Sequence, residues 1–555
     1  MFCGNKNFKP TLSFGFERIH LMKNTFITGT LILIIANTIS KILGAIFKIP
    51  LTYILNEEGM AIFSTSMSVY QTILSLIISG IPLALSRFCA EQYALKNHHV
   101  LKKGIKASTI ILLFLGALGS LVLFLFSDFF SISMKDPAAS FAIKLISPSV
   151  FFVAWGTIYK SYFQGLCNMI PTAISQVVEA LIRLIIGFLI AYKLKDFATE
   201  VAAGGAISGI TVGEIVATLL LFFMFLPSNK KLKPIGTDRR TRDIITAISS
   251  VALPLFLFTV ISSLLNLLDV AIIRNSLLKI TFDEVSARNF LLKYSSYTTH
   301  FDNLLDTHRF TMAGSRWLYG AYSGYALTIF HLPTGIVGAL GVSILPQISQ
   351  SLAVCDIKKA EKITTSSLKF TMILALPFAL LFYMFSNELL RLLFNNTSSS
   401  ILLKELAPCL VFLCISQVFT TILHASGKIV EPFLYSLLGT VIKILVDLFL
   451  VRNPYINISG VPLGAFLCFL TVAILNIISV KKHLRIKFNF INSCIKPIIA
   501  TALMGVIMKL LFSPMSIIFN NEVLSLFVTV GVGGLAYLLM LYTVNAFDDT
   551  LKRKN

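Results

Sequence analysis

The chain is poor in charged residues. Only 13% of its 555 residues are Asp, Glu, Lys or Arg, about half of the roughly 25% found in soluble domains. Hydrophobic residues make up 56%, and the mean hydropathy is +0.82. A water-soluble fold cannot hide that much apolar surface, whereas a bilayer accepts it on all sides. The sequence therefore predicts an integral membrane protein.

The chain also lacks the short motifs of common enzymes. It contains no G-x-x-x-x-G-K-[ST] phosphate loop, no H-E-x-x-H and no G-x-S-x-G. The eight cysteines are scattered without any Cys-x-x-Cys pair, and the eight histidines are dispersed, so no metal site or disulfide framework is indicated. We therefore predict a protein that is not an enzyme and that carries no cofactor.

Long apolar runs recur along the whole chain. A membrane-spanning helix needs roughly 20 such residues, and reading for runs of this length predicts an all-α protein of about fourteen transmembrane helices. Their approximate centres lie near residues 38, 73, 116, 152, 182, 214, 260, 334, 375, 412, 440, 470, 502 and 534.

The basic residues alternate between the loops. Of 47 Lys and Arg, 27 fall in loops that would lie inside, 11 in loops outside, and nine within spans. Inner loops of membrane proteins are the basic ones, so both termini are predicted to be cytoplasmic. Because the net charge of +21 comes from short clusters at span ends, we read it as setting topology and predict no nucleic-acid partner.

The sequence repeats itself. At a displacement of 259, Lys103 aligns with Lys362, and at 260 Lys144 aligns with Lys404 and Pro148 with Pro408. Six spans per repeat is an even number, so the two six-helix lobes are predicted to be parallel, with two further helices at the carboxyl end. Duplicated bundles of this kind commonly rock one half against the other around a central site.

The repeat and the loops together divide the chain. The prediction gives a cytoplasmic segment (1–24), an N-lobe (25–228), a basic linker (229–243), a C-lobe (244–480) with an extracytoplasmic insertion at about 279–318, two last spans (488–546) and a cytoplasmic tail (547–555). The insertion is polar and rich in aromatic residues, including Tyr294, Tyr297 and Trp317.

Charged residues inside spans are expensive and mark a pathway or an ion pair. Lys41 and Lys48 are seven positions apart and therefore on one helix face, with no acidic residue within a turn. Unpaired cations facing a cavity suit a phosphate or pyrophosphate head group. Arg87, at the inner end of the second span, would extend this cluster.

Two more span cations have an acidic residue one turn away. Arg183 follows Glu179, and Lys443 precedes Asp447, so each is either half of an intrahelical ion pair or a further cavity cation. Asp269, in the seventh span, and Asp447, in the eleventh, are candidates for binding a coupling cation or proton; structural pairing is the alternative.

The charged residues in the spans leave three possible functions open. A flippase or exporter of lipid-linked anionic precursors needs cavity cations, whereas a multidrug/cation antiporter would need an acidic cavity. A non-transporting scaffold for envelope assembly would tolerate the loss of Lys41 and Lys48.

Three stretches resemble a known family. The residues SKILGAIFKIP (40–50), SGIPLALSRFCAE (79–91) and LPTGIVGALGVSILPQIS (332–349) are similar to the stage V sporulation protein B family. That family belongs with the polysaccharide exporters and lipid II flippases of the multidrug/oligosaccharidyl-lipid/polysaccharide superfamily.

The resemblance implies two lobes around a V-shaped cavity that opens alternately to each side of a bacterial cytoplasmic membrane. It implies a polyprenyl-pyrophosphate-linked sugar as cargo, with membrane lipids and cell-wall synthesis enzymes as partners. Lys41, Lys48 and Arg87 match basic positions that line the cavity of the lipid II flippases, Lys48 with an offset of about one residue.

The sequence departs from the flippase pattern at two points. Thr328 stands where the flippases have an arginine in the eighth span, which puts lipid II itself in doubt as the cargo. Lys443 replaces the Asn of a sodium site to which Asp269 and Asp447 correspond, and a lysine ammonium can itself take the cation's place. Sodium, protons and the membrane potential therefore stay open as driving forces.

Overall fold

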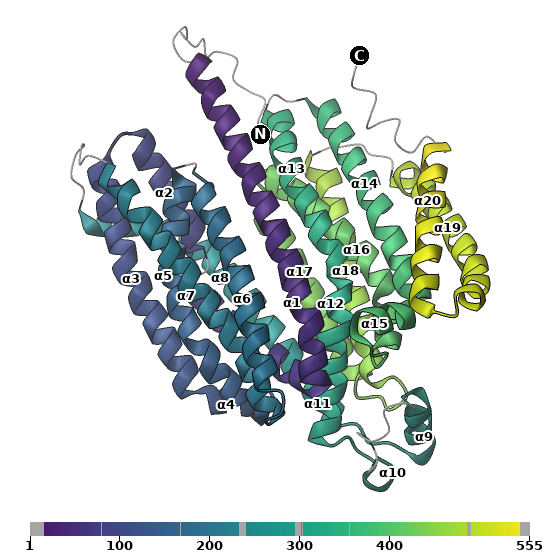
Figure 1. Cartoon of the computed structure of the whole chain (residues 1–555). Coiled ribbons are helices and arrows are strands. Elements are labelled where there is room, and N and C mark those ends of the chain that lie inside the picture. Colours follow the sequence, from purple (N-terminus) through teal and green to yellow (C-terminus); the bar gives the residue numbers. More distant parts are fainter. Residues whose placement is uncertain are drawn as a thin grey trace.

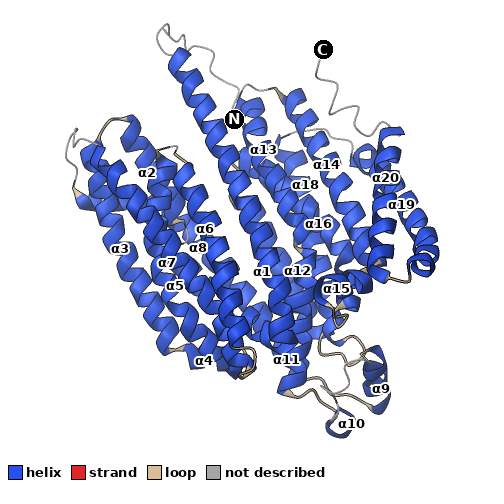
Figure 2. Cartoon of the chain, viewed as in Figure 1, coloured by secondary structure: helices blue, strands red, loops and turns tan. Residues whose placement is uncertain are grey.

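The computed structural model describes residues 16–78, 80–166, 168–231, 240–294, 301, 304–353, 356–484 and 490–543. All regular structure in these ranges is helical, without a strand (Figure 2). Of the predicted segments, the first fifteen residues, most of the basic linker (232–239), Tyr297 and the tail (547–555) lie outside the described residues.

The first lobe is built mainly from long helices packed side by side, with one short helix, α4, among them (Figure 1). They are α1 (Phe16–Ile78), α2 (Ile81–Ala94), α3 (His98–Leu125), α4 (Ser127–Ser133), α5 (Ser140–Gly165), α6 (Ile170–Lys193) and α7 (Thr199–Lys231). The helix α1 is interrupted at Asn56, whose φ of 52° is left-handed. Such a residue breaks the run of helical dihedrals. The helix α1 contains the centres of both the first and the second predicted span.

The second lobe begins with α8 (Thr241–Leu278) and a small insertion. The elements that follow are α9 (Glu284–Lys293), α10 (Leu304–Thr307), α11 (Met312–Gly320), a π-helical stretch (Ala321–Ala326), α12 (Leu327–Phe330), α13 (Leu332–Ala353), α14 (Ile357–Met384), α15 (Ser386–Phe394), α16 (Ser400–Ala425), α17 (Val430–Leu450), α18 (Gly460–Leu484), α19 (Phe490–Phe519) and α20 (Glu522–Thr543).

Twelve helices of the described chain are long and apolar enough to cross a membrane. One of them, within α1, covers two predicted spans, and the predicted span near residue 334 falls on the broken segment α11–α13. The all-α membrane fold is confirmed, while the count of fourteen stays a prediction.

The internal repeat reappears in the helix bounds. Helices α3 and α14 begin and end 259 residues apart, and α5 and α16 begin and end 260 apart. Each repeat also has a short helix, α4 or α15, between these two long ones. The duplicated sequence therefore folds into two copies of one bundle, to which α19 and α20 are added at the carboxyl end.

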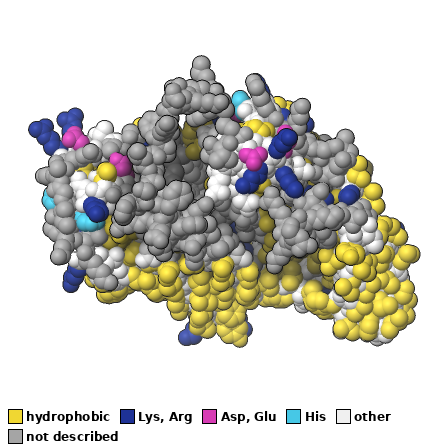
Figure 3. All heavy atoms as spheres, turned by 90° about the horizontal axis from the view of Figure 1, so that it is seen from above, with side chains coloured by type: hydrophobic (Ala, Val, Ile, Leu, Met, Phe, Trp, Pro, Cys, Tyr) yellow, Lys and Arg dark blue, Asp and Glu magenta, His cyan; other side chains and the backbone are white. Residues whose placement is uncertain are grey.

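The outer surface matches a bilayer. Large apolar side chains point away from the protein along the flanks, for example Phe114 at 67% exposure and Leu510 at 69%. Seen from above, hydrophobic side chains gather along the lower and right-hand sides of the molecule (Figure 3). In water this surface would be strongly unfavourable, whereas lipid solvates it.

Helices α1 and α8 run between the lobes. Ile244 and Ile248, near the start of α8, pack with Leu101 of the first lobe. Further along, Phe258 contacts Phe433 of α17, with ring centroids 4.3 Å apart. The start of α1 and the end of α20 lie at one end of the molecule, and α9 and α10 lie at the opposite end, called the distal end below (Figure 1).

The insertion at the distal end has its own aromatic core. The rings of Phe282 and Phe310 have centroids 4.9 Å apart, and Phe301 lies 5.0 Å from Phe290 and 5.4 Å from Trp317. Such clusters bury much apolar area for few residues. The small element expected in this loop is therefore present as α9, α10 and α11.

Helices α6 and α7 approach so closely that glycine is required. A Cβ on Gly209 would lie 2.3 Å from the Cα of Gly187, and small residues at such crossings let helix backbones meet. We expect Gly209→Ala to destabilise the first lobe by about 1–3 kcal/mol through overpacking, seen as a lower melting temperature in detergent. Gly534→Ala, on α20 with no atom within 4 Å of its added Cβ, is the matched control; equal melting temperatures would contradict the packing.

Candidate functional site

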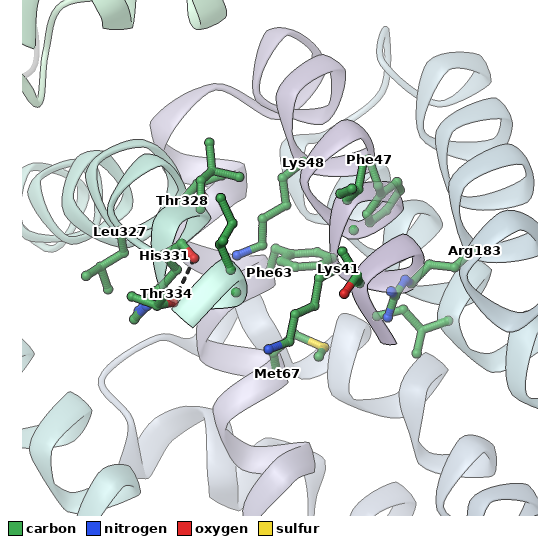
Figure 4. Close-up of a pocket in the computed structure, with 17 residues that line it drawn as sticks. Lys41, Phe47, Lys48, Phe63, Met67, Arg183, Leu327, Thr328, His331 and Thr334 are labelled. Atoms are coloured by element: carbon green, nitrogen blue, oxygen red, sulfur yellow. Dashed lines mark hydrogen bonds between the residues drawn. The ribbon is translucent and has the colours of Figure 1, made fainter. Parts of the chain in front are cut away.

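A cavity of about 580 Å³ lies between the two lobes. One wall comes from α1, α6 and α7, and the other from α12 and the start of α13 (Figure 4). Its lining residues are Thr38, Lys41, Ile42, Gly44, Phe47, Lys48, Phe63, Met67, Arg183, Ile210, Leu327, Thr328, His331, Leu332, Thr334, Gly335 and Ile336. The volume is in the range of small-molecule sites.

Three cations enter this cavity from the first lobe. Lys41 and Lys48 are two turns apart on α1, and Gly44 lies between them on the same face. A Cβ on Gly44 would be 3.5 Å from an Nη atom of Arg183, which is ordinary van der Waals contact. The guanidinium from α6 therefore lies close to the face of α1 that carries Lys41 and Lys48.

Lys41 reaches across to the second lobe. Its Cδ lies 3.5 Å from the position of a Cβ on Gly335, and its Nζ lies 3.6 Å from that on Gly338. These two glycines are one turn apart on α13, and the lysine side chain lies along the helix face that they form. The ammonium therefore sits at the boundary between the lobes.

The wall from the second lobe is polar but uncharged at Thr328 and Thr334. The Thr328 hydroxyl donates to the carbonyl of Gly324 at 2.6 Å, and the Thr334 hydroxyl donates to that of His331 at 2.8 Å. Pro333 follows the break between α12 and α13, and as a proline it cannot donate a backbone hydrogen bond. Each hydroxyl oxygen retains acceptor capacity towards the cavity.

The charges around the cavity have one sign. Among the described lining residues, Lys41, Lys48 and Arg183 are basic and none is acidic. No ion pair to a carboxylate is found for these three in the described parts of the chain, and the Nε of Arg183 is buried there without a hydrogen-bond partner. Clustered like charges in a membrane are costly, so this site suits an anion.

The expected pair of Glu179 with Arg183 does not form. Glu179 instead approaches Lys160 of α5, at 4.0 Å between Nζ and Oε2. The sequence spacing allowed the intrahelical partner, but Lys160 of the neighbouring helix α5 lies closer to the carboxylate. Arg183 is therefore left on the cavity side, where it joins Lys41 and Lys48.

Lys443 lies in a second charged group, apart from the residues that line the cavity. Its Nζ bonds to Asp447 Oδ2 at 2.7 Å and, still more closely, to Asp269 Oδ2. The pair of Lys443 with Asp447 is the intrahelical one that the spacing allowed. A Cβ on Gly464 would lie 2.3 Å from Asp447 Oδ1, so α18 needs a glycine there to accommodate the carboxylate.

The predicted site residues are thus distributed over three places. Lys41, Lys48 and Arg183 meet in the cavity, and Lys443 meets Asp269 and Asp447 in the second lobe. Arg87 lies exposed on α2 and is absent from the described cavity lining. Their roles in binding and coupling stay predictions. No cluster of three or more possible metal ligands occurs among the described residues.

Sequence reasoning assigned no site role to His331 or to a buried ion network at the distal end. His331 lines the cavity (Figure 4), and the position of the -His-Leu-Pro- break in the middle of a predicted span was the available signal. The distal network joins Asp136 to Arg274 and Arg316. Asp136 is 138 residues from Arg274 and 180 from Arg316, so no pattern within one helix predicts these ion pairs.

Comparison with known proteins agrees with this architecture. The family model described as polysaccharide biosynthesis protein matches residues 26–352, and that described as lipid II flippase MurJ matches residues 317–529. Stage V sporulation protein B of Bacillus subtilis is 23% identical over 473 residues, covering 84% of this chain and 86% of its own. Lipid II flippase MurJ of the same organism is 21% identical, covering 96% and 98%.

Solved structures show the same fold. Lipid II flippase MurJ in an inward closed conformation superposes with a TM-score of 0.66 at 16% identity, covering 93% of this chain and 99% of that one. An inward-facing multidrug resistance MATE family transporter of the MOP superfamily gives 0.64 at 14% identity, covering 80% and 94%.

The fold is that of multi-pass membrane transporters, and the matched proteins whose names state a role are a flippase and a multidrug transporter, not enzymes. The chain belongs to the polysaccharide biosynthesis protein family, whose model covers more than half of it.

The Lys443 group yields a stability test. Lys443→Ala leaves the Asp269 and Asp447 carboxylates facing each other, and removing one partner of a buried ion group typically costs about 3–5 kcal/mol. We expect a lower melting temperature, with recovery when Asp269→Asn is added. The exposed Lys509, on α19, gives the control Lys509→Ala. Unchanged stability of Lys443→Ala would refute the pairing.

Proposed function

We propose that this protein is an alternating-access flippase for polyprenyl-pyrophosphate-linked saccharides of the cell wall or of a surface polysaccharide. The observation that carries the proposal is the cavity with Lys41, Lys48 and Arg183 and without an acidic residue among its described lining. A pyrophosphate needs several cations at once, and both ammonium and guanidinium groups bind its oxygens through charge-assisted hydrogen bonds.

The cavity's volume and polarity suggest which part of such a cargo enters the protein and which part stays in the bilayer. A volume of about 580 Å³ suits a head group, while the hydrocarbon chain would remain in the bilayer, where it is already solvated. The hydroxyls of Thr328 and Thr334, on the opposite wall, would accept hydrogen bonds from the first sugar. With Thr328 in place of an arginine, the second lobe adds less positive charge to the site than the lipid II flippases have.

The orientation follows from the loops. Basic residues concentrate on one side of the predicted topology, which by the positive-inside rule is the cytoplasm. In this orientation both termini are cytoplasmic, the distal end is extracytoplasmic, and the cargo is delivered outward across a bacterial cytoplasmic membrane. Association with cell-wall synthesis enzymes, which would supply or consume the cargo, stays a prediction.

The alternatives fit the cavity less well. A multidrug/cation antiporter would need acidic groups facing the drug, and the described cavity lining has none. A scaffold has no use for three cations that face a cavity without an acidic residue among its described lining, because that arrangement only lowers stability. The family's relatives named above include a protein called a lipid II flippase, which supports the anionic cargo.

We propose that transport is driven without sodium, by protons or the membrane potential. One oxygen of each carboxylate, Oδ2 of Asp269 and Oδ2 of Asp447, is bonded to Lys443 Nζ, while each Oδ1 is buried without a hydrogen-bond partner in the described chain. The tethered ammonium already places one positive charge between the two carboxylates, which weakens their attraction for an additional metal cation in this conformation.

The cavity cations are tested by removing them. Lys41→Ala and Lys48→Ala should each lower translocation of a polyprenyl-pyrophosphate saccharide in proteoliposomes at least about tenfold, since a charge-assisted hydrogen bond contributes about 1.5–3 kcal/mol. Both variants should keep wild-type expression and melting temperature. The matched control is Lys509→Ala, which removes a lysine from the exposed face of α19. Wild-type translocation by a stable Lys41→Ala/Lys48→Ala double variant would refute the anion site.

The coupling proposal has its own test. Replacing sodium by choline on both sides of the proteoliposome should leave the translocation rate unchanged, because Lys443 holds the carboxylates. Collapsing the proton gradient and the membrane potential with ionophores should lower it. A rate that rises in proportion to sodium would show that the lysine does not replace the metal ion.

A further inference from the structure

A buried ion network joins the two lobes at the distal end. Asp136 follows α4 in the first lobe, while Arg274 lies near the end of α8 and Arg316 in α11. One carboxylate oxygen of Asp136 lies 2.5 Å from Arg274 Nη1, and the other lies 3.0 Å from Arg316 Nε. A single carboxylate therefore holds two guanidinium groups from the other side.

The network is almost closed to solvent. Asp136 and Arg274 are 0% and 1% exposed, and the side chain of Arg316 is 17% exposed. Arg274 also donates to the hydroxyl of Thr65 at 3.1 Å and to the carbonyl of Lys135 at 2.9 Å. Separating the lobes here would break at least four polar contacts at once.

Further bonds across the same end involve α1 near its kink. The Tyr53 hydroxyl donates to the carbonyl of Leu393 at 3.0 Å, and the side-chain amide of Asn396 donates to Glu57 at 2.7 Å. The backbones also touch, because a Cβ on Gly320 would lie 1.7 Å from the carbonyl oxygen of Glu57. The lobes thus meet tightly at the distal end.

We propose that Asp136, Arg274 and Arg316 form a distal latch, a polar lock that holds the outer side shut and must open before cargo can leave. The inference rests on the proposed alternating access. The latch residues lie outside the described cavity lining. They would set the balance between the inward-facing and outward-facing states.

An ion network suits a lock that opens repeatedly. In the closed state the carboxylate lies against two guanidinium groups that would otherwise be buried without any opposite charge, while in the open state water hydrates all three groups. Because hydration offsets most of the lost attraction, the two states can lie within a few kcal/mol of each other, as a two-state transporter requires.

The test measures distances between spin labels and needs no cargo. Labels at Lys195, in the first lobe, and Asn387, in the second, lie on exposed distal positions. Asp136→Asn removes the charge that both arginines share, and we expect the ratio of long to short distances to rise roughly tenfold, as loss of a charged hydrogen bond implies. Arg316→Gln, a milder change at the least buried member, should shift the ratio in the same direction if Asp136→Asn does not fold.

The matched control is Asp128→Asn. Asp128 pairs with Lys144 at 3.3 Å, and both residues belong to the first lobe, so the change removes an acidic residue near the same end without touching the other lobe. Its distance distribution should equal the wild type's. Identical distributions in Asp136→Asn, Arg316→Gln and wild type would overturn the latch.

The same experiment separates the two proposals. If Asp136→Asn shifts the distances but the wild-type protein translocates no pyrophosphate-linked lipid, the latch stands and the assigned cargo is wrong. If translocation depends on Lys41 and Lys48 while neither latch variant changes the distances, the cargo assignment stands and the latch is refuted.

Discussion

The cost of holding a charge inside a membrane governs this structure. At two places the chain lowers this cost by pairing opposite charges. In the second lobe Lys443 pairs with Asp269 and Asp447, and at the distal end Asp136 pairs with Arg274 and Arg316. In the cavity, by contrast, Lys41, Lys48 and Arg183 converge without an acidic residue among the described lining (Figure 4). A transporter whose cargo is anionic explains this difference, because the cargo itself supplies the missing charge.

The three charged groups also suggest a division of labour between the lobes. The first lobe presents the cations, and the second presents a polar wall with Thr328 and Thr334. Arg183 lies close to Gly44 of α1, and Lys41 reaches across to Gly335 and Gly338 of α13. Since the cavity lies between the lobes, any rocking of one lobe against the other would move the two walls relative to each other and change the contacts with the cargo.

Much of this architecture could be predicted from the sequence, because helix period, hydrophobic length and loop charge are local signals. The repeat at 259–260 residues reproduces the bounds of α14 and α16 from those of α3 and α5, and the shared face of Lys41 and Lys48 follows from their spacing. The rest depends on packing between distant segments. Glu179 pairs with Lys160 rather than Arg183, and Asp136 meets Arg274 and Arg316 across 138 and 180 residues; no periodicity within one helix reports such contacts.

The central claim is that the cavity recognises a pyrophosphate through its cations. The most direct measurement is equilibrium binding of a polyprenyl pyrophosphate to the purified full-length protein, against the corresponding neutral polyprenol, by native mass spectrometry in detergent. The account predicts saturable binding of the pyrophosphate, weakened at least about tenfold in the Lys41→Ala/Lys48→Ala variant, and no comparable binding of the polyprenol. Equal binding of both lipids, or equal affinity of wild type and variant for the pyrophosphate, would contradict it.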